Sequence, residues 1–151
     1  MHDSRTVANR FLALAKSRGD TLTPMQLLKL VYIAHGWMLG LAGRPLIRDQ
    51  VQAWQYGPVI PPLYDALRHY RRDAVTQSLA QPIGDALDPQ EEHMVGEVDR
   101  IYGRLSGGQL SNLTHAKETP WALTYRKGEF GIPIPDDIIK AHYKRLAEQR
   151  G

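Results

Sequence analysis

The chain has 151 residues, of which 42% are hydrophobic, and this length and apolar content predict a single domain over residues 1–151 with an ordinary hydrophobic core. Cysteine is absent, which excludes disulfides and thiolate metal sites and permits a reducing compartment. The 19 basic and 16 acidic side chains give a formal charge of +3, an excess too small to indicate nucleic acid as the partner.

The N-terminal segment predicts a short amphipathic helix and no membrane element. Its apolar residues recur on one helical face between Thr6 and Lys16, and Asp3 or Ser4 can cap the first turn. The segment has no uninterrupted apolar stretch, so we expect neither a signal peptide nor a membrane span. The expected protein is soluble and cytoplasmic.

The second predicted helix has the strongest start signal in the sequence. Thr23 can cap it, Pro24 suits its first position and Gln26 can complete a capping box. Residues 27–41 are apolar around most of the helix circumference, which predicts a central, buried helix. A thin stripe roughly opposite its main face consists of Lys29, Gly36 and Gly40.

The segment after this helix predicts a small hairpin and then a rigid corner. Two short extended candidates, Leu46–Ile47 and Val51–Trp54, are separated by polar residues, as in a hairpin. Residues 54–61 then combine Trp54 and Tyr56 with a glycine and two prolines, which together hold the aromatic side chains in a fixed pose. Such a corner is more typical of a binding surface than of a catalytic centre.

The rest of the chain predicts further helices around one long loop. Residues 73–87 lack a sustained period and form the loop. Asp88 caps the helix that follows, and Ser106-Gly107-Gly108 ends it. Further helices are expected from Pro61 onwards, at 109–116, at 120–126 and at about 136–149, with Met94, Val98, Ile101 and Leu105 on the inward face of the fourth helix. The predicted fold is mainly α, a compact bundle of about five to seven helices around a central buried helix, with a small β-hairpin.

The side chains that could do chemistry form no recognisable constellation. The histidines lack metal-ligand spacing and no glycine-rich phosphate loop follows a predicted strand, so we expect no metal and no cofactor. Ser111 and His115 with a carboxylate could form a nucleophilic trio, which leaves a small hydrolase as a weak alternative. His35 falls on the buried arc of the second helix, where a hydrogen-bonded core histidine is favoured over a catalytic or ligand-binding imidazole.

A group of arginines on the third helix has two interpretations. Arg68, Arg71 and Arg72 are spaced to share a helix face, which is most often solvated but could contact phosphates or an acidic protein. A nucleic-acid-binding regulator of phage or mobile-element origin therefore stays an alternative. That function would require the trio to form one continuous basic surface with Lys140, Lys144 and Arg145.

Three segments, in this order, resemble one known family. They are Leu27–Trp37 (LLKLVYIAHGW), Ala53–Tyr64 (AWQYGPVIPPLY) and Leu110–His115 (LSNLTH) followed by Pro120-Trp121. The segments resemble the Panacea domain, the family of phage-associated, SocA-like antitoxins. Together with the last helix, they span nearly the whole chain.

The resemblance implies an antitoxin of a type II toxin–antitoxin system. Such a protein neutralises a cognate protein toxin by direct binding and catalyses no reaction. One branch of the family acts as a proteolytic adaptor that delivers its toxin to the ClpXP protease, and a homo-oligomer is a further option. By this resemblance the chain is not an enzyme.

The corner and the arginines are the expected partner-binding surface, and the other motif residues are expected to hold the fold. The expected partner-binding residues are Trp54, Tyr56, Gly57, Pro58, Arg68, Arg71 and Arg72. The expected structural residues are Tyr32, His35, Gly36, Trp37, Thr114, His115, Pro120 and Trp121. Trp54 has a second interpretation, in which it pins the hairpin to the central helix.

Overall fold

A computed structural model describes residues 1–150, and within them the chain forms seven α-helices and a small sheet. The helices are α1 (Ser4–Ser17), α2 (Pro24–Trp37), α3 (Pro61–Leu67), α4 (Pro89–Tyr102), α5 (Gly107–His115), α6 (Pro120–Thr124) and α7 (Asp136–Arg150). A π-helical turn, η1 (Met38–Ala42), extends α2, and a 3₁₀ turn, η2 (Arg68–Tyr70), extends α3. The strands are β1 (Gln52–Trp54), β2 (Gly57–Val59) and β3 (Ile132–Pro133). The mainly α class with a small β-hairpin is confirmed.

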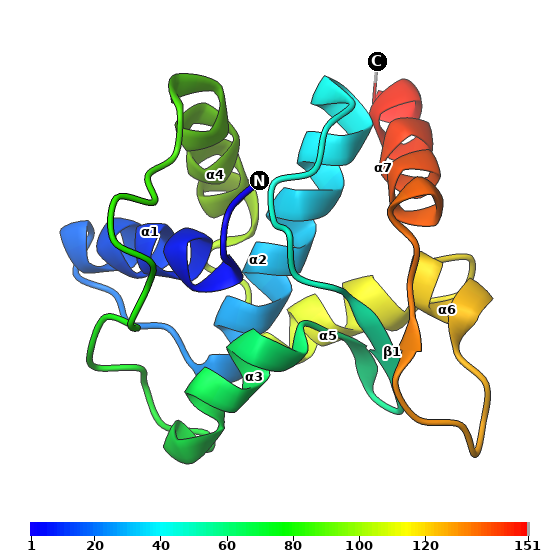
Figure 1. The fold of residues 1–151 in the computed structure, drawn as a ribbon, viewed down its shortest axis with the longest axis horizontal. Coiled ribbons are helices and arrows are strands. Elements are labelled where there is room, and N and C mark those ends of the chain that lie inside the picture. Colours follow the sequence, from blue (N-terminus) through cyan, green and yellow to red (C-terminus); the bar gives the residue numbers. More distant parts are fainter. Residues whose placement is uncertain (151) are drawn as a thin grey trace.

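The helix α2 runs through the middle of the molecule, as predicted, with other helices arranged around it (Figure 1). Its start uses the predicted capping box, in which Thr23 Oγ1 accepts from the Gln26 backbone and the Gln26 side chain accepts from the Thr23 backbone. It contacts α1, α4, α5, α7 and the strand β2. Full burial of an aliphatic or aromatic side chain contributes about 1.5–3 kcal/mol, so this helix carries much of the stabilising apolar area.

Two of the three residues in the stripe expected opposite the main face of α2 are buried as well. Lys29 and Gly36 are both covered, because the hairpin lies over the first and α7 lies over the second. A β-carbon at Gly36 would overlap the ring of Tyr143, and one at Gly40 would lie 2.8 Å from Cβ of Tyr143. The two glycines therefore let α7 approach closely, at the point where α2 passes into the π-helical turn.

The hairpin forms one segment later than predicted. Strands β1 and β2 pair antiparallel with Trp54 opposite Gly57, so Gln55 and Tyr56 make the turn. The pairing of Leu46–Ile47 with Val51–Trp54 was wrong, because Ile47 instead forms a parallel bridge with His2 at the N-terminus. Strand β3 pairs on the other side of β1, giving the order β2-β1-β3.

The inward face predicted for the fourth helix is right for three of its four residues. Val98 is buried, and Met94 and Leu105 are partly buried against the core, whereas Ile101 is 43% exposed and Val95 is buried in its place. The helix also ends at Tyr102, and Ser106 caps α5 by accepting a hydrogen bond from the Gln109 backbone. Residues 106–108 therefore begin the next helix, because a serine before a helical segment supplies the cap that its free N–H groups need.

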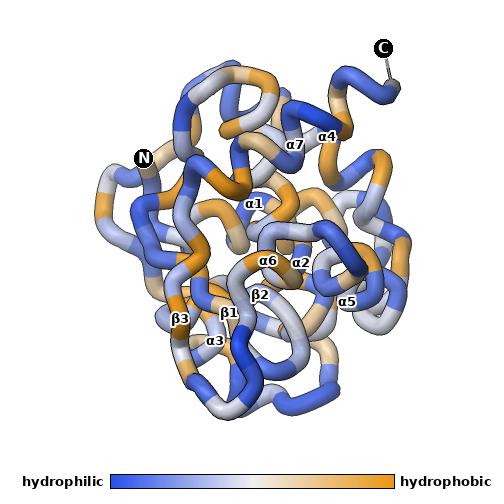
Figure 2. Tube along the Cα trace, turned by 90° about the vertical axis from the view of Figure 1, so that its right-hand side faces the viewer, coloured by the Kyte–Doolittle hydropathy of each residue, from blue (hydrophilic) through white to orange (hydrophobic). Residues whose placement is uncertain are grey.

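The remaining segments fit around this core. The predicted loop over residues 73–87 is confirmed, and it runs past α1 to the start of α4 (Figure 1). The three strands and α3 gather at one end of the molecule and α4 lies at the other, in both views (Figures 1 and 2). Over residues 1–150, no helix has both the length and the apolar character needed to cross a membrane.

Candidate interaction surface

The hairpin turn exposes its two residues, Gln55 and Tyr56, and the two residues that follow it are buried. Tyr56 is 75% exposed, whereas Gly57 and Pro58 are buried against the rest of the protein. Gly57 adopts φ of 129°, and a β-carbon there would lie 3.0 Å from Nζ of Lys29. Only glycine satisfies both constraints, so Gly57 allows the turn to sit directly over the lysine.

Lys29 is a cation enclosed by protein. Its side chain is 4% exposed, and its Nζ donates to the carbonyl oxygen of Pro58 at 2.9 Å. Burial lowers the pKa of Lys29 to about 8, because the charged form loses its hydration. Pro58 supplies its only hydrogen-bond acceptor among residues 1–150, although an ammonium group has three donors.

Trp54 connects the hairpin to three other parts of the chain. Its ring meets Tyr64 of α3 edge-on at 5.0 Å and Phe130 at 4.9 Å between centroids. Its backbone oxygen accepts a hydrogen bond of 2.5 Å from the indole N–H of Trp121 in α6. Trp54 therefore pins the hairpin to α3, to α6 and to the segment that carries Phe130.

A cavity of about 320 Å³ lies between the hairpin, the first turns of α2 and the α3–η2 segment. Apolar and aromatic side chains form its walls, and Lys29, Arg68 and Arg71 supply its cationic groups. No carboxylate is present in this lining. The complete lining is Pro24, Met25, Leu28, Lys29, Trp54, Tyr56, Val59, Tyr64, Leu67, Arg68 and Arg71.

The arginines predicted for the partner surface are all exposed at this end of the molecule. Arg68 has a single acidic neighbour, Asp65, at 4.0 Å, and both side chains are well solvated, so this pair contributes little. Arg71 has φ of 55° and ψ of −111°, a conformation that costs a non-glycine residue about 1–3 kcal/mol. The chain is therefore held in an uncommon geometry where it turns at the rim of the cavity.

His35 is fully buried and both of its ring nitrogens are engaged. Nδ1 accepts from the backbone N–H groups of Leu46 and Ile47 at 3.2 and 3.3 Å. The proton of a neutral ring must then be on Nε2, which donates to Asp136 at 2.9 Å. These contacts tie α2 to the segment after η1 and to the start of α7, as expected of a histidine that holds the core.

The other aromatic motif residues of α2 pack against α7. The ring of Tyr143 lies edge-on to Tyr32 at 6.3 Å and to Trp37 at 5.1 Å. Both contacts depend on Gly36, because that residue leaves the space that the Tyr143 ring fills. The sequence motif in α2 thus serves the packing of the last helix.

The third motif builds the junction of α5 and α6. Thr114 donates to the carbonyl oxygen of Leu110, Pro120 opens α6, and Trp121 meets His115 edge-on at 5.6 Å. Ser111 Oγ and His115 Nδ1 are 3.3 Å apart, and no carboxylate bonds to this histidine within residues 1–150. The pair therefore lacks the third member of the trio considered from the sequence.

The arginines at 68, 71 and 72 and the basic residues of α7 lie on elements that are far apart. In Figure 1, α7 lies across the molecule from α3 and η2, with α2 and α5 between them. The two groups of basic residues therefore come from separate parts of the molecule. The described residues also contain no cluster of three or more side chains suited to metal binding.

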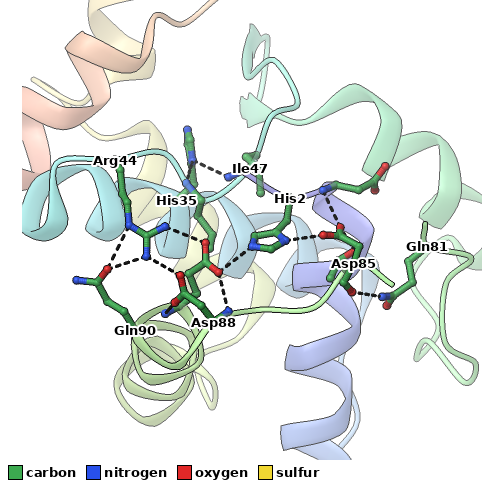
Figure 3. A network of polar contacts seen from close by, with 12 residues as sticks. His2, His35, Arg44, Ile47, Gln81, Asp85, Asp88 and Gln90 are labelled. Carbon is green, nitrogen blue, oxygen red and sulfur yellow. Dashed lines mark hydrogen bonds and ion pairs between the residues drawn. The ribbon is translucent and has the colours of Figure 1, made fainter. Parts of the chain in front are cut away.

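Sequence reasoning missed a network that holds the long loop. The ring of His2 bridges Asp85 at 2.6 Å and Glu91 at 2.7 Å, and Arg44 bonds to Glu91 and Asp88 (Figure 3). Its members come from three separate segments, the N-terminus, the segment after η1 and residues 85–91, so spacing along the chain gives no signal for it. The burial of Lys29 was missed for another reason. As a lone lysine in an apolar helix, it was assigned to the thin stripe opposite the main face.

The comparisons with known proteins point to one family. A family model described as "Antitoxin SocA-like, Panacea domain" matches residues 27–122, which include the motifs in α2, the hairpin and α5–α6. Antitoxin SocA of Caulobacter vibrioides (strain NA1000 / CB15N) is 29% identical over 155 residues, covering 94% of this chain and 82% of that protein. No solved structure matches. The chain belongs to the Panacea domain family of SocA-like antitoxins.

Proposed function

We propose that this chain is the antitoxin of a type II toxin–antitoxin pair and neutralises a cognate protein toxin by direct binding. The observation that carries the proposal is the family match over residues 27–122, together with a relative that is named an antitoxin. Neutralisation by contact needs a shaped surface and no reacting group. The incomplete trio at Ser111 and His115 is consistent with such a role.

The contact surface in this proposal is the end of the molecule formed by the hairpin turn, α3 and η2. Tyr56 and the arginines Arg68, Arg71 and Arg72 are exposed there, and aromatic and arginine side chains are enriched at protein interfaces. Gly57 and Pro58 are buried and contribute indirectly, because they fix the turn that exposes Tyr56. Trp54 borders the surface and holds it in place.

Proteolytic delivery would be a second stage of the same function. An adaptor must bind its toxin before ClpXP can degrade it, so the contact surface is needed in either case. The two forms of neutralisation differ in what happens when the protease is absent. Neutralisation by binding alone persists in a host without ClpX, whereas neutralisation through delivery is lost.

The proposal is tested by expressing the product of the adjacent gene, alone and together with this chain, and measuring growth. Growth arrest by the neighbour alone and rescue by this chain are expected. A variant with Tyr56→Ala, Arg68→Glu and Arg71→Glu should lose rescue and lose co-purification with the toxin. The matched control is Lys140→Glu with Lys144→Glu, two exposed charge reversals on α7 that should rescue fully.

Two results would overturn parts of this proposal. The proposed function would be wrong if the product of the adjacent gene does not impair growth, or if this chain does not restore growth in its presence. Full rescue by the triple variant, combined with failure of the α7 control, would move the contact surface to the other side of the molecule.

A further inference from the structure

The cavity beneath the hairpin turn is electrostatically one-sided. Arg68 and Arg71 lie at its rim and Lys29 lines its interior, while no acidic side chain faces it. Its volume of about 320 Å³ is near the lower end of the roughly 300–1,000 Å³ typical of ligand pockets, which is room for a side chain or two and not for a large cofactor.

Lys29 is the unusual member of this lining. Its ammonium group is removed from solvent, yet one carbonyl oxygen, that of Pro58, is its only protein acceptor among the described residues. Buried cations are normally paired with an anion or fully hydrogen-bonded, because the loss of hydration is otherwise uncompensated. Two donors of Lys29 are left without an acceptor among the described residues, and Lys29 belongs to the lining of the cavity.

The apolar walls of the cavity favour an occupant that carries an apolar group next to its anionic group. The Trp54 and Tyr64 rings form an edge-on pair, and Met25 and Val59 continue the apolar lining. Met25 and Tyr56 are also exposed at the mouth, so apolar surface continues from the cavity to the outside. An occupant that matches both features carries a carboxylate next to an aromatic or aliphatic group.

We propose that this cavity receives a carboxylate-bearing side chain of the bound toxin, with Nζ of Lys29 as its ion-pair partner and an adjacent apolar side chain against Trp54 and Tyr64. The identity of the partner rests on the proposed function, whereas the chemistry of the site does not. The carboxylate supplies the acceptors that Lys29 lacks in the free protein. Arg68 and Arg71 guide the anion to the mouth.

The site is tested directly with 3-phenylpropionate, a small carboxylate with an aromatic group, and with 3-phenylpropionamide, its uncharged counterpart. Titration of the ¹⁵N-labelled protein should give saturable amide shifts around Met25, Val59 and Arg68 with the carboxylate. The amide should bind at least tenfold more weakly. Signals of Leu41 and Ile101, which line a separate apolar cavity, should not move and serve as the internal control.

Two variants assign the effect to Lys29. Lys29→Met should weaken binding of the carboxylate at least tenfold and bring it to the level of the amide. Lys140→Met removes an exposed lysine on α7 and should leave binding unchanged. Equal binding of the two probes, shifts that map elsewhere, or no saturable shift with the carboxylate would each overturn the proposal.

The toxin assay separates this inference from the antitoxin role. If Lys29→Met folds, loses the probe and also loses rescue of growth at least in part, the toxin uses the site. Full rescue by Lys29→Met would overturn the toxin as occupant while the antitoxin function stands. If the product of the adjacent gene does not impair growth, the antitoxin role is overturned. The difference in affinity between the carboxylate and the amide would still show whether the cavity binds a carboxylate.

Discussion

The ammonium group of Lys29 and the carbonyl oxygen of Pro58 are 2.9 Å apart, with the hairpin turn closed over both. The hydrogen bond orders the turn, but it leaves a charge in a site that disfavours charge. The turn that presents Tyr56 is therefore built on a group whose charge state depends on pH.

This charge predicts an unusual pH dependence of stability. The pKa of Lys29 is about 8 in the folded protein and 10.5 in the unfolded chain, so between these values the unfolded state binds more protons and stability rises with pH. The size of the effect is at most ~3 kcal/mol between pH 8 and 10.5. Burial also raises the pKa of Tyr32 and Tyr143, which opposes the rise above about pH 10.

The measurement is urea unfolding of the wild type and Lys29→Met at pH 7 and at pH 9.5. The variant should gain stability relative to the wild type at pH 7 and lose part of that advantage at pH 9.5, because only the wild type titrates at this site. A difference between the two proteins that is independent of pH would contradict the assignment of the low pKa to Lys29.

The close approach of α7 to α2 predicts that Gly36→Ala is strongly destabilising. The added methyl group overlaps the ring of Tyr143, and forced repacking of a dense core typically costs about 1–3 kcal/mol. Gly96 in α4 is the matched control, because a β-carbon there meets nothing within 4 Å. Gly96→Ala should stabilise the protein by about 0.5–1 kcal/mol through helix propensity. Thermal melts of the two variants should shift in opposite directions.

The bridge made by His2 should make its own largest contribution to stability in mildly acidic solution. Burial lowers the pKa of His2, but hydrogen bonds to Asp85 and Glu91 outweigh it and leave this pKa above 6.5. The stabilisation is thus fully present below pH 6.5 and is lost as pH rises through the raised pKa. Burial raises the pKa values of Asp85 and Glu91, but the hydrogen bonds that these carboxylates accept have the larger effect and leave both pKa values lowered. The network therefore also weakens in acid, where the carboxylates become protonated.

Replacement of the imidazole checks this assignment. Between pH 5.5 and pH 8, the unfolding free energy should fall less in His2→Gln than in the wild type, because only the wild type carries the bridge. Hydrogen exchange at the amide of Asp3, which donates to Asp85, should follow the same titration. If the exchange rate of this amide in the wild type changes with pH only as the intrinsic chemical rate does, the result would count against the bridge.

The two aromatic residues of the hairpin should differ in their effect on folding. Tyr56→Ala is expected to change the free energy of unfolding by less than about 0.5 kcal/mol, because the ring is mostly exposed. Trp54→Ala removes two ring contacts and should cost about 3 kcal/mol or more. Chemical denaturation of both variants decides the point, and a large loss in Tyr56→Ala would mean that its effect on toxin binding reports folding.

Local signals predicted the starts of α2 and α4, and long-range contacts account for the strand pairing and the burial that the sequence did not reveal. The capping boxes at Thr23 and Asp88 involve residues three positions apart, so they can be recognised without the fold. The bridge between Ile47 and His2 joins segments far apart in the chain, which is why the first hairpin prediction was wrong. The same limit applies to the surface, since the burial of Lys29 depends on a turn that folds over it.

The pairing of β1 has a consequence for the timing of synthesis. The strand that carries Trp54 is flanked by β3 at Ile132–Pro133, and its last backbone oxygen is bonded to Trp121. A growing chain has made Tyr56 and the arginines long before these supports exist. The surface proposed for toxin binding is therefore completed only after Trp121 and β3 have been synthesised, so under the proposed function a nascent chain that ends before residue 133 should not yet neutralise the toxin.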